Sequence, residues 1–308
     1  MRKENPKDER QRRIAELAYD YDSKPRQRRL DCNLCGGKRF VTLTHRDRYG
    51  YAANADGCLR CGLVFLNPFM NAEAYAHFYT EVYRPLVSAY HGRRIDAESI
   101  QDEQRVYAVA CGDFLESRVL EAGCKTLLDI GGSTGVVAHG LKERFDLQAT
   151  VIDPAPMEID VARSLGLQTV TGFVEDYDSG GATYDLIVLC QTVDHLLDVQ
   201  LSLSKVRSLL SKRGLFFVDI VDFRAAYRRN GSVVGAVKID HPYYIVEHTM
   251  SAYLRRNGFD VLAVDYAADH LHIGYLCAPA EREPDWLPAA EVVAEQWREI
   301  RSIQNPLP

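Results

Sequence analysis

The chain has 308 residues and a formal net charge of −6, which argues against a protein that binds nucleic acid through charge alone. Hydrophobic residues make up 46% of it and charged residues 26%, as in globular proteins, and apolar runs such as 215–221 are too short to span a bilayer. Residues 1–30 contain neither the apolar stretch nor the cleavage site of a signal peptide. We therefore expect one main globular domain with additions, no membrane association and a cytoplasmic location.

Residues 1–30 form a locally basic N-terminal arm. Its cationic residues include Lys3, Lys7, Arg10, Arg12, Arg13, Arg26, Arg28 and Arg29. A solvated, partly helical arm is the simpler interpretation of such a cluster, and a contact with RNA phosphates is the alternative.

Four of the eight cysteines follow a metal-binding pattern within residues 31–69. A CxxC pair, a gap of 22 residues and a second CxxC pair are formed by Cys32, Cys35, Cys58 and Cys61. Two such pairs can bring four thiolates onto one tetrahedral Zn²⁺, with a short β-hairpin between them. Two disulfides are the alternative, but they fit poorly in a chain without an export signal. We predict a structural zinc ribbon, in which His45 is a hairpin side chain and not a ligand.

Residues 70–120 have a helical period and are rich in tyrosine. Tyr75, Tyr79 and Tyr83 are four residues apart and share one face of a predicted helix, and a second helix is predicted over 98–120. Packing against the next domain would explain most of these rings. A lid that closes over a ligand is the alternative for one or two of them, and Tyr79 and Tyr83 are the candidates for orienting a substrate.

Strands and helices alternate over residues 121–280. Apolar runs predict strands at 127–130, 149–152, 185–190 and 215–221, with helical segments between them. This alternation is typical of a doubly wound parallel sheet, whose ligands bind beyond the carboxyl ends of the strands. LLDIGGSTG at 127–135 and VIDP at 151–154 lie at such ends, so we place the binding site there.

The glycine-rich turn indicates a ligand that contains ribose but is not NAD. Asp153 lies 22 residues after Gly131, where an acid can accept hydrogen bonds from ribose hydroxyls. Val136 stands where a dinucleotide turn has its third glycine, and the Lys-Ser or Lys-Thr pair of a P-loop is missing. Asp129 would repel a phosphate and attract a cationic amine. A ribose with a cationic amino-acid tail describes S-adenosylmethionine.

These motifs resemble those of class I S-adenosylmethionine-dependent methyltransferases over about residues 121–280. LLDIGGSTG resembles their first motif, with Ser133 at its middle glycine, and VIDP resembles the second. GFVEDYD at 172–178 corresponds to the third motif, and VLCQTVDHLLD at 188–198 to the fourth. FDVLAVDYA and HLHIGYLCAP are close enough to form a terminal antiparallel hairpin. The resemblance implies an α/β, Rossmann-like methyltransferase sheet, parallel except for that hairpin, preceded by the zinc ribbon and a helical lid.

The resemblance also implies which residues bind the cofactor. Asp153 would hold the ribose, Phe173 and Val174 would flank the adenine, and Gln191 would lie beside the methionine moiety. The complete predicted set is Asp129, Gly131, Gly132, Ser133, Gly135, Asp153, Pro154, Phe173, Val174 and Gln191. His195 is expected only to cap or pack the helix that follows.

The N-terminal part resembles the zinc ribbons of bacterial small-molecule and sugar methyltransferases, through CLRCGLVFLNP at 58–68 and FYTEVYRPL at 78–86. In sugar C-methyltransferases of this type an acid–His pair precedes a helix and Gly-Phe. DHPYYIVEHTMSAYLRRNGF at 240–259 matches that spacing and places Asp240 and His241 on the pair. A methyl acceptor has to lose a proton, so His241 is the candidate base, with Asp240 beside it. Those enzymes commonly have a second α/β domain after the hairpin, whereas 281–308 form largely one amphipathic helix.

The segment 222–238 is the candidate site for an anionic group of the acceptor. Arginine forms bidentate contacts with phosphate and carboxylate, although a solvated loop is an equally good interpretation. The residues concerned are Arg224, Tyr227, Arg228, Arg229 and Lys238.

The predicted function is methyl transfer to a small-molecule acceptor, such as a sugar, a nucleotide sugar or a natural-product intermediate. A zinc-ribbon RNA methyltransferase is one alternative, although the Asn-Pro-Pro-Tyr type motif of adenine amino methylation is replaced by Gln191-Thr192-Val193. A non-catalytic module that keeps the cofactor is another. The oligomeric state is not indicated by the sequence.

Overall fold

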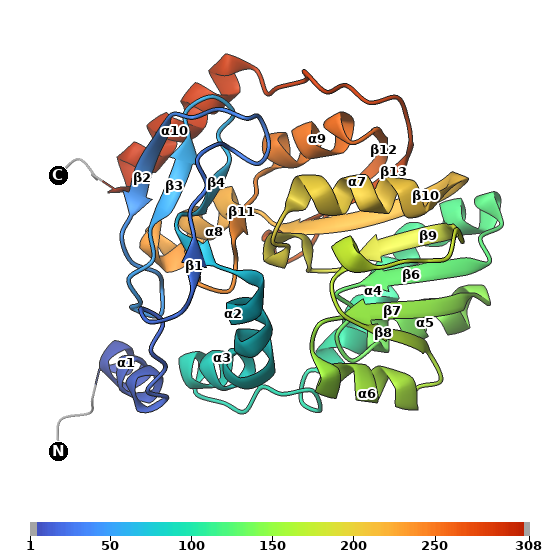
Figure 1. The fold of residues 1–308 in the computed structure, drawn as a ribbon, viewed down its shortest axis with the longest axis horizontal. Helices are drawn as coiled ribbons and strands as arrows, with labels where there is room; N and C mark the ends of the chain where they lie inside the picture. The colour runs from blue at the N-terminus through green and yellow to red at the C-terminus, as the bar shows by residue number, and fades with distance from the viewer. Residues whose placement is uncertain (1–4, 305–308) are drawn as a thin grey trace.

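The structure is a computed structural model that describes residues 5–304, and its centre is a seven-stranded mixed sheet (Figure 1). The strand order is β12-β13-β10-β9-β6-β7-β8, and all neighbours from β10 to β8 are parallel. Strand β13 is antiparallel to both β10 and β12, which confirms the predicted terminal hairpin. The strands are β6 (Thr126–Ile130), β7 (Gln148–Asp153), β8 (Gln168–Thr171), β9 (Tyr184–Leu189), β10 (Leu210–Val221), β12 (Phe259–Tyr266) and β13 (His272–Pro279). Of these seven strands, only β8 was not identified from the sequence.

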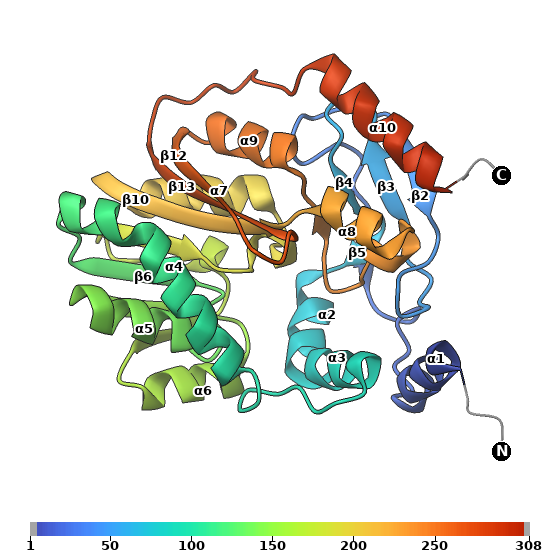
Figure 2. The same ribbon diagram turned by 180° about the vertical axis from the view of Figure 1, so that it is seen from behind.

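Helices cover both faces of this sheet (Figures 1 and 2). Successive side chains of a strand point to opposite faces, so Leu127 joins the core beneath one group of helices and Leu128 the core beneath the other. The first group is α4 (Gln101–Ala122), α5 (Val136–Phe145) and α6 (Pro156–Ser164), and the second is α7 (Val199–Leu209) and α9 (Glu247–Arg256).

The cysteine-containing region forms a second sheet with the order β11-β4-β3-β2. Its strands are β2 (Phe40–Thr44), β3 (Ala55–Cys58), β4 (Val64–Leu66) and β11 (Tyr243–Tyr244). Because β11 comes two residues after His241 and pairs with β4, the ribbon holds the segment that carries the predicted acid–His pair. A small antiparallel pair, β1 (Arg26–Gln27) and β5 (Phe69–Met70), lies beside this sheet.

The basic N-terminal arm includes helix α1 (Pro6–Glu16), which lies against α3 (Tyr83–His91). Nε of Arg13 donates to the carbonyl oxygen of Ala89 at 2.8 Å, and the Arg10 guanidinium lies 4.3 Å from the centre of the Tyr90 ring. The predicted helix is confirmed, but the expectation of a solvated arm is wrong for these arginines, because α3 offers them an aromatic ring and a free carbonyl. Lys3, in residues 1–4, lies outside the described residues.

The tyrosine-rich segment is helical but not one regular helix. Helix α2 (Ala72–His77) continues through a π-helical turn, η1 (Phe78–Val82), into α3. Tyr75 is fully buried and its hydroxyl donates to the carbonyl oxygen of Ile239 at 3.1 Å, so it packs as the simpler interpretation expected. The rings of Tyr79 and Tyr83, with centroids 5.6 Å apart, lie farther along this segment.

The C-terminal helix α10 (Ala290–Gln304) lies along the ribbon, as both ribbon views show (Figure 2). Nε2 of Gln296 donates to the carbonyl oxygen of Gly62 at 3.0 Å. Residues 305–308, the end of the predicted helical tail, lie outside the described residues. None of the helices within residues 5–304 combines the length and the apolar character that a membrane span requires.

Helix α8 (Phe223–Asn230) is joined to α10 by ion pairs. Arg224 lies 2.7 Å from Glu299, and Arg228 also pairs with Glu299. The predicted anion clamp is therefore wrong for these two arginines, since a carboxylate of the chain already neutralises them. It is also wrong for Tyr227, which is buried.

Candidate functional site

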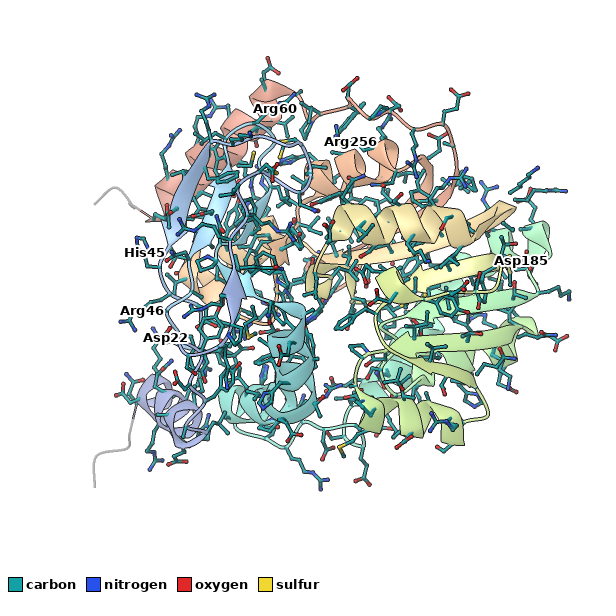
Figure 3. The ribbon with its side chains drawn as sticks, viewed as in Figure 1. Asp22, His45, Arg46, Arg60, Asp185 and Arg256 are labelled. Atoms are coloured by element: carbon teal, nitrogen blue, oxygen red, sulfur yellow. The ribbon has the colours of Figure 1, made fainter. Side chains whose placement is uncertain are left out.

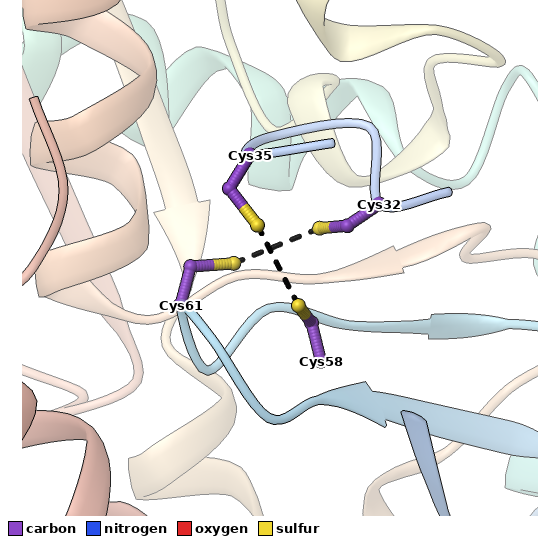
Figure 4. Close-up of side chains that lie close together, drawn as sticks. All are labelled: Cys32, Cys35, Cys58 and Cys61. Carbon is purple, nitrogen blue, oxygen red and sulfur yellow. Dashed lines mark hydrogen bonds between the residues drawn. The ribbon is translucent and has the colours of Figure 1, made fainter. Parts of the chain in front are cut away.

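Four cysteine sulfurs converge between the two knuckles of the ribbon (Figure 4). The Sγ atoms of Cys32 and Cys61 are 3.6 Å apart, as are those of Cys35 and Cys58, and all four lie within 4.8 Å of one another. Four sulfurs at about 2.3 Å from a tetrahedral zinc would be about 3.8 Å apart, whereas a disulfide needs about 2.05 Å. The four thiols are buried and unbridged, so this donor set fits Zn²⁺.

His45 does not belong to the cysteine cluster. Its Nδ1 lies 3.0 Å from Oδ1 of Asn54, and Figure 3 shows the residue at the outer edge of the ribbon. The interpretation of His45 as a hairpin side chain is confirmed.

A cavity of about 520 Å³ lies at the carboxyl ends of β6, β7 and β9, between the sheet and the tyrosine-rich segment. A volume of this size is typical of small-molecule sites. Nine of the ten predicted cofactor residues line it: Asp129, Gly131, Gly132, Ser133, Asp153, Pro154, Phe173, Val174 and Gln191. Tyr79, Tyr83 and His195 line the same cavity. The structure therefore brings the predicted cofactor motifs together with the two predicted substrate-orienting tyrosines.

Gly135 is the exception among the predicted cofactor residues. It does not line the cavity, and a Cβ at this position would lie 2.7 Å from Cβ of Ala162 on α6. This glycine allows the start of α5 to approach α6 closely, and its contact with the cofactor stays a prediction.

The first two glycines of the turn permit close approach of the backbone. Gly131 has φ +70°, and a Cβ there would lie 2.3 Å from Cγ2 of Thr192. A Cβ on Gly132 would lie 2.6 Å from Oδ2 of Asp129. Any larger residue would clash at these positions, so the turn keeps its backbone exposed to the cavity.

Two buried carboxyl groups flank this turn. Both oxygens of Asp129 are buried with no hydrogen-bond partner among the described residues, and burial raises the pKa of this carboxyl to about 7. Asp153 accepts hydrogen bonds from the backbone N–H groups of Ser133 at 2.9 Å and Ala155 at 2.8 Å, while burial raises its pKa to about 6. A buried acceptor without a donor is costly, so Asp129 favours a cationic ligand that supplies one.

Arg84 and Glu158 also line the cavity, and neither was predicted from the sequence. Nη2 of Arg84 lies 2.7 Å from Oε1 of Glu158 and 3.4 Å from Oγ of Ser133. The pair joins α3 to α6 across 74 residues of sequence, so no local pattern indicates it. Two features of the sequence could have indicated these residues: Arg84 is next to Tyr83, and Glu158 lies in the first turn of α6, shortly after Asp153.

His195 faces the main cavity from a short 3₁₀ turn, η3 (Val193–His195). Its Nδ1 lies 3.0 Å from the hydroxyl of Tyr79, which donates to the carbonyl oxygen of Asp240 at 3.1 Å. Burial lowers the pKa of His195 to about 4, so the imidazole is neutral at physiological pH. The expectation that His195 only packs or caps a helix is wrong, because the 3₁₀ turn ends here and directs the ring into the cavity.

His241 lies behind His195, with ring centroids 4.4 Å apart, and lines a second, smaller cavity. Its Nε2 is 2.9 Å from Nζ of Lys238 and 3.5 Å from Oδ2 of Asp240. Burial, followed by the charge of Lys238, lowers the pKa of His241 well below its usual value. His195, Asp240 and His241 are close enough to share a metal ion. However, Nε2 of His241, one of the nitrogens that could bind it, already contacts Nζ of Lys238.

Comparisons with known proteins identify the domain family of this chain. A family model described as a methyltransferase domain matches residues 75–264, more than half of the chain. A S-adenosylmethionine-dependent methyltransferase from Clostridium acetobutylicum aligns in structure with a TM-score of 0.46 and 15% identity, over 68% of this chain and 99% of that one.

Two curated relatives are similar over about a third of the chain. The ubiquinone biosynthesis O-methyltransferase of Methylocella silvestris is 30% identical over 106 residues, which are 32% of this chain and 38% of that protein. The protein of the same name from a Methylobacterium species is 28% identical over 103 residues, 32% of this chain and 41% of that protein. The chain thus spans about two fifths of the length of the curated relatives it matches.

Proposed function

This chain belongs to the methyltransferase-domain family, and on that premise we propose that it transfers a methyl group from S-adenosylmethionine to a hydroxyl group of a small molecule. One observation carries the proposal: a single cavity contains the glycine turn on one side and His195, Tyr79 and Tyr83 on the other. Methyl transfer needs the cofactor and the acceptor to be held in line, and this cavity has groups suited to each.

The cofactor side fits S-adenosylmethionine, which supplies an electrophilic methyl group when bound. The unpaired oxygens of Asp129 suit its ammonium group. Asp153 is suited to accept hydrogen bonds from the ribose hydroxyls, and Phe173 and Val174 offer apolar surface for the adenine. Arg84, paired with Glu158 across the mouth of the turn, connects α3 to this side of the cavity and supports the proposal that 70–120 act as a lid.

We propose an oxygen acceptor because the two curated relatives are named as O-methyltransferases. A sugar, a nucleotide sugar or a natural-product intermediate, as the sequence resemblance implied, would each offer a hydroxyl group. Such a hydroxyl must lose its proton during transfer, so a neutral base has to face the cavity.

His195 is the better placed of the two candidate bases. The Tyr79 hydroxyl has a single proton, which it donates to the carbonyl oxygen of Asp240. In its contact with Nδ1 of His195 the hydroxyl oxygen therefore accepts, so Nδ1 carries the hydrogen. Nε2 of His195 then keeps a free lone pair that can accept the acceptor's proton. Nε2 of His241, in contrast, accepts from Lys238. We therefore assign the base to His195 and propose that His241, with Asp240, positions it.

We also propose that Cys32, Cys35, Cys58 and Cys61 hold one structural zinc. A closed set of four thiolates leaves no open position for catalysis. The ion would fix the ribbon, which in turn holds β11 and the residues just before it.

One zinc per chain is the expected result of elemental analysis on protein purified in reducing buffer. Because structural zinc contributes to folding, Cys58→Ser is expected to lose the metal and to lower the yield of soluble protein. Cys124→Ser, at a buried cysteine outside the cluster, is the matched control and should keep its zinc. Wild-type protein without zinc would contradict the assignment.

Transfer of a labelled methyl group tests the proposed function. Protein incubated with methyl-labelled S-adenosylmethionine is expected to label a compound in a small-molecule extract, which mass spectrometry can identify as a methyl ether. A parallel incubation with bulk RNA should leave the RNA unlabelled. Label in RNA would instead favour the zinc-ribbon RNA methyltransferase alternative.

A further inference from the structure

A second cavity, of about 220 Å³, lies on the other side of His241 from the cofactor site. It is built from elements far apart in sequence: the ribbon, helix α8, the loop before β11 and the turn between β12 and β13, which lies near α8 (Figure 2). Its polar lining includes Arg48, Asp194, Arg229, Lys238, His241 and His272. The wall therefore contains two permanently charged arginines, Arg48 and Arg229, and the lysine Lys238, whose pKa is lowered by burial.

The two arginines in this wall are not neutralised by the chain. Among residues 5–304, no carboxylate oxygen lies within 4 Å of the guanidinium of Arg48 or Arg229, and Nε of Arg48 is buried with no hydrogen-bond partner. The neighbouring Arg228, in contrast, pairs with Glu299. Arginines that are left unpaired around a cavity favour an anionic ligand.

Packing holds Arg48 and the backbone of Lys238 in place, whereas Arg229 is exposed on α8. The Arg48 guanidinium lies 3.9 Å from the centre of the Tyr90 ring, and its backbone N–H donates to the carbonyl oxygen of Val237 at 2.8 Å. The Tyr244 hydroxyl donates to the carbonyl oxygen of Lys238 at 2.6 Å and accepts from its N–H at 2.9 Å. This part of the wall is thus preorganised, which lowers the entropic cost of binding.

Asp194 does not cancel this charge near neutral pH. It accepts a hydrogen bond from the N–H of Val221 at 3.2 Å, and burial raises its pKa to about 8, so its carboxyl group is largely protonated at pH 7. His272 is engaged by Asp269, with Nδ1 and Oδ2 2.6 Å apart. The wall keeps an excess of positive charge.

We infer that this cavity receives an anionic group of the methyl acceptor, a carboxylate or a phosphate, held by Arg48, Arg229 and Lys238. The inference rests on the proposed function and adds a chemical class to its substrate. His241 forms part of the wall and contacts His195 ring to ring. An acceptor whose anionic group binds here would have to extend past the His241 ring to bring its hydroxyl group to His195, the proposed base.

Binding of inorganic phosphate and of acetate to protein saturated with S-adenosylhomocysteine tests the inference. Loss of one charge-assisted contact is expected to weaken anion binding about tenfold or more in Arg229→Gln and in Arg48→Gln. Arg228→Gln is the matched control, since Arg228 is adjacent on α8 but paired with Glu299, and it should bind like wild type. Tighter binding of phosphate than of acetate would identify a phosphate acceptor, and the reverse a carboxylate.

The same anion is expected to inhibit labelled methyl transfer competitively with the acceptor. Equal anion affinity in Arg229→Gln and Arg228→Gln would overturn the inference, as would an anion that binds without inhibiting transfer, because that result describes a site independent of the acceptor. Titration of S-adenosylhomocysteine into the same preparations separates two kinds of failure. If it binds but no anion does, only this inference fails, whereas a protein that does not bind it contradicts the proposed function.

Discussion

The variant His195→Ala is expected to lose turnover by about 10²- to 10⁴-fold, the usual contribution of a general base, and to keep its affinity for S-adenosylhomocysteine. The ring lies in the cavity with the glycine turn, but the groups proposed to hold the cofactor belong to other elements. Initial rates at saturating S-adenosylmethionine, with calorimetry on the same preparations, check both parts of the prediction.

Two further variants make this result specific. His241→Ala should have a smaller loss, because His241 contacts His195 but not the main cavity. His77→Ala is the matched control, since His77 is an exposed histidine on α2 that lines neither cavity, and it should have normal turnover. A larger loss of turnover in His241→Ala than in His195→Ala would contradict our assignment. It would support His241, the residue predicted from the sequence, as the base.

The pH dependence distinguishes a buried base from an exposed one. Burial lowers the pKa of His195 to about 4, and only the neutral imidazole can accept a proton. As the pH is lowered, kcat/KM is therefore expected to fall only well below pH 6.5, the ordinary pKa of histidine being about 6.5. Sequence reasoning alone would place this fall near that ordinary value.

Sequence reasoning located the cofactor side of the site better than the acceptor side. The cofactor motifs are local: Asp129 and the glycine turn follow one strand, and Asp153 ends the next. Adjacent parallel strands bring their carboxyl ends together, so chain order alone predicts that these residues meet. The motif alone does not distinguish a glycine that contacts a ligand from one that, like Gly135, allows two helices to pack closely.

The acceptor side depends on contacts between distant segments. His195 meets Tyr79 and Asp240 across 116 and 45 residues, and Arg84 meets Glu158 across 74. Neither periodicity nor spacing encodes such contacts. The ribbon was predicted from its cysteines, but its fourth strand, β11, was not, since a two-residue strand forms only because β4 offers it an edge.

Asp153→Ala is expected to weaken the binding of S-adenosylhomocysteine about 100-fold or more, the effect of losing two hydrogen bonds to a charged acceptor. Its carboxylate also accepts from the N–H groups of Ser133 and Ala155, so its removal loosens the turn as well. Asp160→Ala is the matched control: Asp160 lies on the exposed side of α6, where it pairs with Arg163, and its loss should leave affinity unchanged.

Calorimetric titration of S-adenosylhomocysteine into wild type and Asp153→Ala is the most direct test of the claim that this cavity binds the methyl donor. We predict about one molecule bound per wild-type chain, no competition from NAD, and at least 100-fold weaker binding by the variant. Equal affinities for the two proteins, or displacement by NAD, would contradict the account.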